Sequence, residues 1–452
     1  MAEIVSFRGY RFNKMMAGDL NKVVTQPYDN ISDELREDYL DRSDYNVVRI
    51  IKDKPLETDT PNDNPYKRAA QRWDEWIENR ILTKENGPAI YPYFQEYTVE
   101  GKTFLRKGLI AMVGLDEKKS KVRAHEHTLS GPKADRLKLM KATEANDGQI
   151  FMLYNDSEQK INAIIDQELI GAFPIMKVTD DFGAVHKLYR ITRPGAVLDI
   201  AELFEHHELF IADGHHRFET AVNYMNYCKE RRWEPVKATK GESFTHRMMT
   251  LVNMHDPGLK VLPTHRVIHS LENFDPNKFL KKAEDNFEIG TYSNSEELYS
   301  ALDQADVSGM SAFGFAAEGL DGFRLLTLKN ESIMNTLVTE EHCDEWKKLD
   351  VTILHVALLE NILGIDKAKL EAKTNINYLR GRDEAIAKLK DGNQAVFLLN
   401  STKVNQVMDV ASKGERMPQK STDFFPKLLT GMVMMKMNID KSMGLAYYEA
   451  DL

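Results

Sequence analysis

The stretch HELFIADGHHRFETAVNYM, residues 207–225, decides the local fold that we expect and contains a row of polar residues. Residues 209–212 form a short apolar run, which is typical of a buried strand. After the polar row, apolar residues recur at helical spacing from Phe218 to Cys228, so that one face of a helix packs inward. The sequence therefore predicts a strand, a tight turn and a helix.

The turn itself consists of Asp213, Gly214, His215, His216 and Arg217. Glycine permits a left-handed backbone, which brings the chain close to a ligand. The N–H groups and the positive dipole end of the helix would attract an anion, and Arg217 would grip a phosphate. Asp213 would act as a magnesium ligand or general base, and the two histidines would contact phosphoryl oxygens or carry a proton.

A purely structural alternative is that Asp213 caps the helix and that both histidines are ordinary hydrogen-bonding residues. This alternative explains each residue taken alone. Five such residues in succession favour a functional site, because loop ends on rigid scaffolds commonly carry chemistry.

The bulk composition limits the class of protein. With 452 residues, the chain exceeds the roughly 250–300 residues at which one core stops growing, so we expect two or three lobes. The net charge of -10 argues against nucleic-acid binding as the main function. Cys228 and Cys343 stand far apart, which predicts neither a disulfide framework nor a structural zinc site. The chain shows no signal peptide and no run of about 18 apolar residues, so we expect a cytoplasmic protein without a membrane segment.

Strand and helix patterns alternate along the chain, which predicts a mixed α+β fold. We expect helices over 33–40, 67–82 and 350–363, a further helix from about Lys133, and strands over 45–52, 149–154 and 394–400. Hairpins are expected around Glu100–Gly101, over 176–192 and over 311–328. We divide the chain into an N-terminal α+β region over 1–255 with the catalytic core, a smaller α+β subdomain over 256–340, and a helical and β region over 341–452 that contributes a loop to the site.

Several stretches resemble a prokaryotic family known as domain of unknown function 1015. They are ADGHHRFETA, VVTQPYDNIS, YNVVRIIK, HEHTLSGPKADRLKLMKAT, LPTHRVI and ERMPQKSTDFFPKLLTG, and they are spread over nearly the whole chain. The turn also resembles the phosphate-binding turn of the ParB and sulfiredoxin-like superfamily, which includes free-serine kinases. This second resemblance covers a small part of the chain and implies a ParB/sulfiredoxin-like core with additional α+β lobes.

The resemblance to the free-serine kinases implies a phosphotransferase that converts L-serine into O-phosphoserine. Its cofactors would be Mg²⁺ and a phosphate donor, which is ADP, ATP or pyrophosphate, since the chain has no Walker GxxxxGK[ST] motif. By the same resemblance, Asp213, His215 and His216 are catalytic, Asp213 binds the metal, and Gly214 and Arg217 bind the donor phosphates.

The kinases also use a separate glutamate that deprotonates the serine hydroxyl. We assign this role to Glu126 in the stretch AHEHT, because it lies among two histidines and a threonine just before a turn and a helix. Glu34 and Glu202 are weaker candidates. An exposed loop carboxylate remains the structural alternative for Glu126.

Two basic stretches provide further candidate phosphate ligands. Lys133 and Arg136 lie near an expected helix start in SGPKADRLK. Arg416, Lys420 and Ser421 lie in the expected loop KGERMPQKST, whose cations and hydroxyls suit an anion.

Other motifs in the sequence point to functions other than that of a free-serine kinase. HEHTL lacks the second histidine of a zinc helix, and DFG at 181–183 has no glycine-rich loop before it. The alternatives left open are a phosphoserine phosphatase and a nucleotide-gated ParB-like DNA-binding protein, and the acidic balance counts against the latter. The expected partner is a small molecule, L-serine or phosphoserine, with no nucleic acid and no membrane, and a homodimer is allowed.

Overall fold

The structure is a computed structural model that describes residues 1–118, 120–124 and 130–442. The described residues form two compact units. Unit 1 comprises residues 1–118, 120–123, 130–259 and 426–442, and unit 2 comprises residues 124 and 260–425. Within these ranges, no helix is both long enough and apolar enough to cross a membrane.

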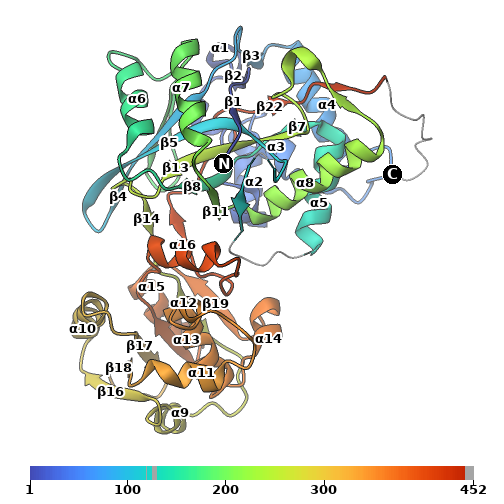
Figure 1. Cartoon of the computed structure of the whole chain (residues 1–452). Coiled ribbons are helices and arrows are strands. Elements are labelled where there is room, and N and C mark those ends of the chain that lie inside the picture. The colour runs from blue at the N-terminus through green and yellow to red at the C-terminus, as the bar shows by residue number, and fades with distance from the viewer. Residues whose placement is uncertain (119, 125–129, 443–452) are drawn as a thin grey trace. The chain divides into compact units, whose positions relative to one another are not determined.

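A nine-stranded mixed sheet forms the framework of unit 1 (Figure 1). The strand order is β6-β11-β8-β13-β5-β4-β10-β9, and β1 pairs with β5. The strands of this sheet are β1 (Ile4–Val5), β4 (Tyr91–Val99), β5 (Lys102–Gly114), β6 (Val122–Arg123), β8 (Ile150–Tyr154), β9 (Met176–Thr179), β10 (Val185–Leu188), β11 (Leu209–Asp213) and β13 (His246–Asn253). Every residue of β8 and β13 is buried, as expected for central strands covered on both faces.

Eight helices of the described residues accompany this sheet. They are α1 (Lys14–Ala17), α2 (Asp33–Arg42), α3 (Val48–Ile51), α4 (Pro65–Glu78), α5 (Ser130–Thr143), α6 (Lys160–Glu168), α7 (Pro194–Phe204) and α8 (His215–Glu230). Helices α6 and α7 pack against each other, and α3, α4, α5 and α8 form a second group in which neighbours are in contact (Figure 1).

The segment 426–442 belongs to unit 1 although unit 2 precedes it in the chain. Its strand β22 (Met435–Lys436) pairs with β7 (Ala145–Asn146), and β23 (Ile439–Asp440) pairs with β12 (Glu234–Pro235). Thr430 also exchanges two backbone hydrogen bonds with Thr25. A smaller pair, β2 (Tyr10–Phe12) and β3 (Leu82–Lys84), completes the strands of this unit. Unit 1 is therefore assembled from distant parts of the chain.

Unit 2 is built on a six-stranded antiparallel sheet in the order β16-β18-β17-β20-β15-β19. The strands of unit 2 are β14 (Lys260–Val261), β15 (His265–Ile268), β16 (Phe287–Tyr292), β17 (Ala312–Ala317), β18 (Phe323–Leu328), β19 (Ile376–Leu379), β20 (Ala395–Leu398) and β21 (Phe424–Phe425). Its helices are α9 (Pro276–Ala283), α10 (Ser295–Val307), α11 (Met334–Leu337), α12 (Asp344–Lys347), α13 (Asp350–Ile353), α14 (Lys367–Ala372), α15 (Arg382–Ala387) and α16 (Val404–Ser412).

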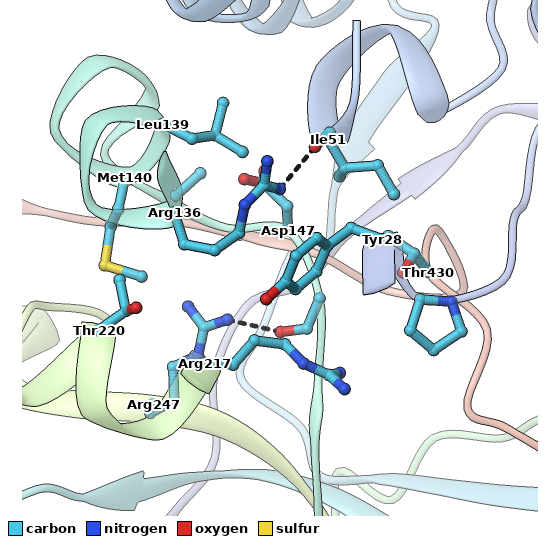
Figure 2. A pocket seen from close by; sticks show the side chains of 13 residues that line it. Tyr28, Ile51, Arg136, Leu139, Met140, Asp147, Arg217, Thr220, Arg247 and Thr430 are labelled. Carbon is cyan, nitrogen blue, oxygen red and sulfur yellow. Dashed lines mark hydrogen bonds between the residues drawn. The ribbon is translucent and has the colours of Figure 1, made fainter. Parts of the chain in front are cut away.

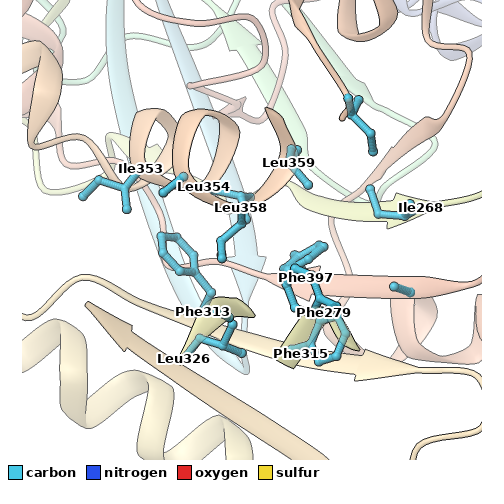
Figure 3. Close-up of a cluster of buried hydrophobic side chains, with 14 of the residues drawn as sticks. Ile268, Phe279, Phe313, Phe315, Leu326, Ile353, Leu354, Leu358, Leu359 and Phe397 are labelled. Carbon is cyan, nitrogen blue, oxygen red and sulfur yellow. The ribbon is translucent and has the colours of Figure 1, made fainter. Parts of the chain in front are cut away.

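The core of unit 2 lies between this sheet and a buried helical segment. Helix α13 continues as a π-helix over Leu354–Glu360, which packs onto the phenylalanines of the sheet (Figure 3). The rings of Phe315 and Phe397 lie 5.1 Å apart and are fully buried. The buried helix expected over 350–363 is thus confirmed.

The α+β class expected from the sequence is confirmed, and most individual elements are as well. Helix α2 begins after Ser32, whose Oγ accepts a hydrogen bond from the Leu35 N–H at 3.1 Å. The hairpin β4–β5 turns at Glu100 and Gly101, both of which have positive φ. The strand expected over 45–52 is wrong. This segment contains helix α3, whose Val48 N–H donates to Asn46 Oδ1, so tertiary context overrides the β propensity of Val and Ile.

The two compact units divide the chain differently from the three regions expected over 1–255, 256–340 and 341–452. Strands from the second and third of these regions pair within one sheet, as β17 does with β20. Residues 260–425 therefore share a single unit. The segment 426–442 belongs to unit 1 instead, because its strands pair with β7 and β12.

Candidate functional site

The turn that was expected to carry the chemistry lies where β11 meets α8. Gly214 has φ 99° and ψ 32°, a left-handed conformation, and α8 begins directly after it. The pairing of β11 with β8 shifts register between Ile211 and Asp213, which redirects the last side chain of the strand. Strand, turn and helix are confirmed as predicted.

The Asp213 carboxylate does not cap the helix. Its Oδ2 accepts a hydrogen bond from Arg217 Nη2 at 2.8 Å, and its Oδ1 lies 3.8 Å from Lys427 Nζ. The N-cap position of α8 is Gly214, so Asp213 does not hold the position that the capping alternative gives it. Burial by itself would raise the pKa of Asp213, but Lys427, Arg217 and His215 hold it well below its ordinary value. The carboxylate is therefore ionised at neutral pH.

Arg217 is the central cation of the turn, and only 7% of its surface is exposed. One Nη donates to the backbone carbonyl of Gln149, and the other lies between two carboxylates, 2.8 Å from Asp213 and 3.6 Å from Asp29. Burial opposes the charge of Arg217, but Asp29 and Asp213 raise its pKa above the ordinary value. The guanidinium is thus held in one orientation by groups from three segments of the chain.

The two histidines of the turn have different environments. His215 is buried at the start of α8 and helps to lower the pKa of Asp213. His216 is half-buried and lines a cleft. Burial lowers the pKa of His216 in spite of the nearby Asp29 and Glu219, so its imidazole is neutral at pH 7. A neutral imidazole can accept a proton or donate a hydrogen bond to a ligand in the cleft.

The cleft beside His216 has a volume of about 550 Å³. Such a volume is within the roughly 300–1,000 Å³ of small-molecule sites. Its lining combines three cations with three carboxylates and two tyrosines, namely Arg36, Lys52, Arg136, Asp29, Asp53, Asp135, Tyr28 and Tyr66. The cleft is therefore strongly polar and suits a charged ligand.

A smaller cavity adjoins the cleft, and the two share Tyr28, Ile51, Arg136 and Leu139. Figure 2 shows Tyr28 with Arg136 on one side and Arg217 on the other. The Arg136 guanidinium lies 4.2 Å from the centre of the Tyr28 ring, and one of its Nη atoms donates to the carbonyl of Ile51. Among the candidate phosphate ligands of the first basic stretch, the structure brings Arg136 close to the turn.

The remaining candidates of unit 1 are less directly placed. Lys133 Nζ donates to Glu219 Oε2 at 2.9 Å on the side of α8. Glu126 lies outside the described residues. Glu34 and Glu202 are exposed on α2 and α7, and neither lines the cleft or the smaller cavity.

The second basic stretch belongs to unit 2. Arg416 lines a cavity of about 240 Å³ there, and Lys420 lines another of about 390 Å³. The Ser421 hydroxyl donates to the carbonyl of Pro418 at 2.5 Å. Among the cavities that the described residues line, Arg416 and Lys420 therefore belong to different ones.

Three residues beside the turn were missed by the sequence reasoning. Asp29 and Lys427 both lie in stretches that carried the family resemblance, so that resemblance was the available signal for them. Arg247 lines the smaller cavity from the start of the buried strand β13, where an arginine directly before an apolar run was the only hint. Their proximity to Arg217 comes from tertiary structure.

The carboxylates beside the turn determine whether it could hold magnesium. The described residues contain no cluster of three or more His, Cys, Asp or Glu side chains that could hold a metal. Magnesium at phosphoryl-transfer sites is commonly held by one or two carboxylates together with substrate phosphates. Asp213 and Asp29 flank the same guanidinium and fit this second arrangement, in which the ion arrives with the phosphate donor.

Comparison with known proteins identifies the family. The model of the family "Protein of unknown function (DUF1015)" matches residues 4–352, and the chain belongs to this family. Among solved structures, a conserved hypothetical protein from Pyrococcus furiosus is 14% identical, with 71% of this chain and 92% of that chain covered and a TM-score of 0.33. A free serine kinase in complex with AMP is 12% identical, with 73% and 88% covered and a TM-score of 0.35. No curated protein matches the chain.

Proposed function

We propose that unit 1 transfers a phosphoryl group from a donor phosphate to the hydroxyl of free L-serine. The observation that carries the proposal is the strand-to-helix turn, in which Asp213, Arg217 and Lys427 form one ion-pair cluster at the N-terminus of α8. A helix N-terminus with adjacent cations stabilises the charge of phosphate oxygens. His216 and Asp29 extend this cluster into the 550 Å³ cleft, where a donor of the size of a nucleotide has room.

The donor phosphates would lie against the turn. Arg217 and Lys427 would stabilise negative charge on the group being transferred, and Gly214 would let the backbone approach it, because glycine has no side chain in the way and adopts the left-handed φ of the turn. Catalysis of this type is mainly positioning and electrostatic stabilisation. Asp213 and Asp29 would hold Mg²⁺, which would supply positive charge to offset that of the donor phosphates.

The reaction needs a base for the serine hydroxyl. In the proposed step the serine oxygen loses its proton to a carboxylate, forms a bond to the terminal phosphorus, and the bridging P–O bond of the donor breaks as the leaving phosphate departs. Glu126 remains our proposal for this base. Arg416, Lys420 and Ser421 remain proposed anion-binding residues of unit 2, and ADP, ATP or pyrophosphate remains the proposed donor.

The test is phosphorus NMR of the full chain with Mg²⁺ and L-serine, in parallel incubations with ADP, ATP and pyrophosphate. We expect phosphoserine with one donor, a loss of at least about a hundredfold in Asp213→Asn, and a similar loss in Glu126→Gln. The matched control is Asp199→Asn, which removes an exposed carboxylate from α7 and should leave the rate unchanged.

Other outcomes of the same experiment contradict the proposal. If no donor yields phosphoserine, and added phosphoserine releases orthophosphate in an Asp213-dependent manner, the site is a phosphatase. If neither reaction occurs, binding of duplex DNA with and without nucleotide, measured at two salt concentrations, tests the ParB-like alternative.

A further inference from the structure

The smaller cavity of unit 1 contains buried cations that the proposed turn chemistry does not fully use. Its lining includes Arg136, Arg217 and Arg247, together with the hydroxyl residues Tyr28, Thr220 and Thr430 (Figure 2). One carboxylate, Asp147, also lines it. Asp147 Oδ1 accepts a hydrogen bond from Trp73 Nε1 at 2.8 Å, and burial raises the pKa of Asp147. The charge of this lining is therefore predominantly positive.

Arg247 is 4% exposed, and within the described residues its guanidinium donates hydrogen bonds to neutral groups. One Nη donates to Asn146 Oδ1, and the other donates to the carbonyl of Gly148 at 2.8 Å. Burial lowers the pKa of Arg247 to about 10, although the nearby carboxylate of Asp147 opposes this shift. A buried cation is costly unless anions compensate for it. Since burial outweighs the effect of Asp147, Arg247 marks a position where a further negative group would be stabilised.

The polar atoms that lack a partner in this region are mostly donors. Among the described residues, buried N–H groups without a hydrogen-bond partner include the Nε atoms of Arg217 and Arg247, whose side chains line the cavity, and the side-chain amides of Asn146 and Gln149, whose neighbours in the chain line it. These four residues form two hydrogen-bonded pairs, since Arg217 donates to the Gln149 carbonyl and Arg247 to Asn146. An excess of buried donors predicts an acceptor-rich ligand, because an unmet buried donor costs about 1–3 kcal/mol.

The size of the cavity limits what this ligand is. Its volume is about 40 Å³, and one water needs about 10–15 Å³ by the same measure. The cavity thus holds a group of about three oxygen-sized atoms, whereas a nucleoside requires the larger cleft. A carboxylate or a phosphate group matches both the size and the donors, since guanidinium groups bind both anions through paired N–H donors.

We propose that the cavity formed by Arg136, Arg217 and Arg247 binds a single oxyanion group of a substrate, a carboxylate or a phosphate group. The proposal rests on the proposed function only for the choice of L-serine as a probe. Arg217 then contributes to two sites. One of its Nη atoms belongs to the ion-pair cluster of the turn, and the same side chain, with its unpartnered Nε, lines the cavity.

The test is isothermal titration calorimetry of the full chain with inorganic phosphate, L-serine and L-serinamide, which lacks the carboxylate. We expect Arg247→Met to weaken binding of the oxyanion probe by about tenfold or more, because a charge-assisted hydrogen bond is lost. Arg247→Lys keeps the charge and should recover part of the affinity. Arg106→Met is the matched control, since Arg106 is also fully buried in unit 1 and donates to Gln95 and to the Pro426 carbonyl.

The arms of the titration distinguish the two anions. Arg247-dependent binding of L-serine but not of L-serinamide identifies a carboxylate site, and Arg247-dependent binding of phosphate identifies a phosphate site. Equal affinities in the wild type, Arg247→Met and Arg106→Met overturn the proposal, as they leave only water in the cavity. If binding depends on Arg247 but no phosphoserine forms, the oxyanion site stands and the kinase proposal falls. If Arg247→Met makes phosphoserine with an unchanged KM for serine and an unchanged KM for the donor, the kinase proposal stands and the oxyanion site falls.

Discussion

The substitution Gly214→Ala tests whether the backbone of the turn and the position of Arg217 are coupled. Gly214 has φ +99°, a conformation that L side chains rarely adopt, and an alanine Cβ there would lie 3.1 Å from Cζ and Nε of Arg217. A non-glycine residue in such a region costs about 1–3 kcal/mol. The guanidinium would also have to move by a few tenths of an ångström. Because that shift weakens its charged hydrogen bond to Asp213, we expect about 1 kcal/mol more.

Gly431→Ala is the matched control, because Gly431 has nearly the same φ of +98° but a Cβ there would make only ordinary contacts at 3.4 Å. We expect a loss of about 2 kcal/mol of unfolding free energy at Gly431 and about 3 kcal/mol at Gly214. Urea unfolding followed by tryptophan fluorescence reports mainly on unit 1, since three of the four tryptophans, Trp73, Trp76 and Trp233, belong to it. In the phosphorus NMR assay, Gly214→Ala should lower the rate of phosphoserine formation by about tenfold or more.

Equal losses of stability in the two alanine variants, together with a full rate of phosphoserine formation in Gly214→Ala, would refute this reasoning. Such a result would mean that the Arg217 guanidinium accommodates the new methyl group without changing its contact with Asp213. The turn would then need its glycine for backbone conformation alone.

Three further predictions concern charge and packing. Lys427→Met removes one of the cations that oppose the burial of Asp213, so the pKa of Asp213 should rise toward its ordinary value, as measured by NMR titration of carboxyl-labelled aspartate. The folded-state pKa of His216 lies below its unfolded value of about 6.5, so unfolding free energy should fall as the pH drops below about 6.5, and His216→Gln should reduce this dependence in urea titrations at pH 5 and 7. Phe397→Ala should destabilise unit 2 by about 3–5 kcal/mol, measured by differential scanning calorimetry, because the ring is fully buried among aromatic neighbours.

The local part of the candidate site was predictable because its signals are local. An apolar run, a glycine and helical spacing specify strand, turn and helix between Leu209 and Cys228, and the structure confirms all three. The left-handed backbone at Gly214 was also predicted. These features depend on sterics and on burial along neighbouring residues, which one segment of sequence contains.

The partners of the turn could not be predicted in the same way. Asp29 lies 188 residues before Arg217 and contacts its guanidinium, Arg247 lies 30 residues after it and lines the same cavity, and Lys427 lies 210 residues after it and contacts Asp213. Pairing across such separations depends on the whole sheet. The helix at Val48–Ile51 was not predicted for the same reason. Its β-branched residues favour a strand locally. In the fold, the buried Asn46 side chain accepts a hydrogen bond from the Val48 N–H and donates one to the Lys22 carbonyl.

The return of residues 426–442 to unit 1 has a consequence for the order in which the protein folds. A chain emerging from the ribosome presents residues 1–259 first, but β7 and β12 lack their partner strands until the last part of the chain is made. Residues 260–425 contain all six strands of the second sheet, so this unit can complete its hydrogen bonding earlier. Lys427 and Thr430 reach the ion-pair cluster and the oxyanion cavity after both sheets have been synthesised. The proposed anion-binding groups are thus complete only after this segment has been made, and a nascent chain lacking it has an incomplete candidate site.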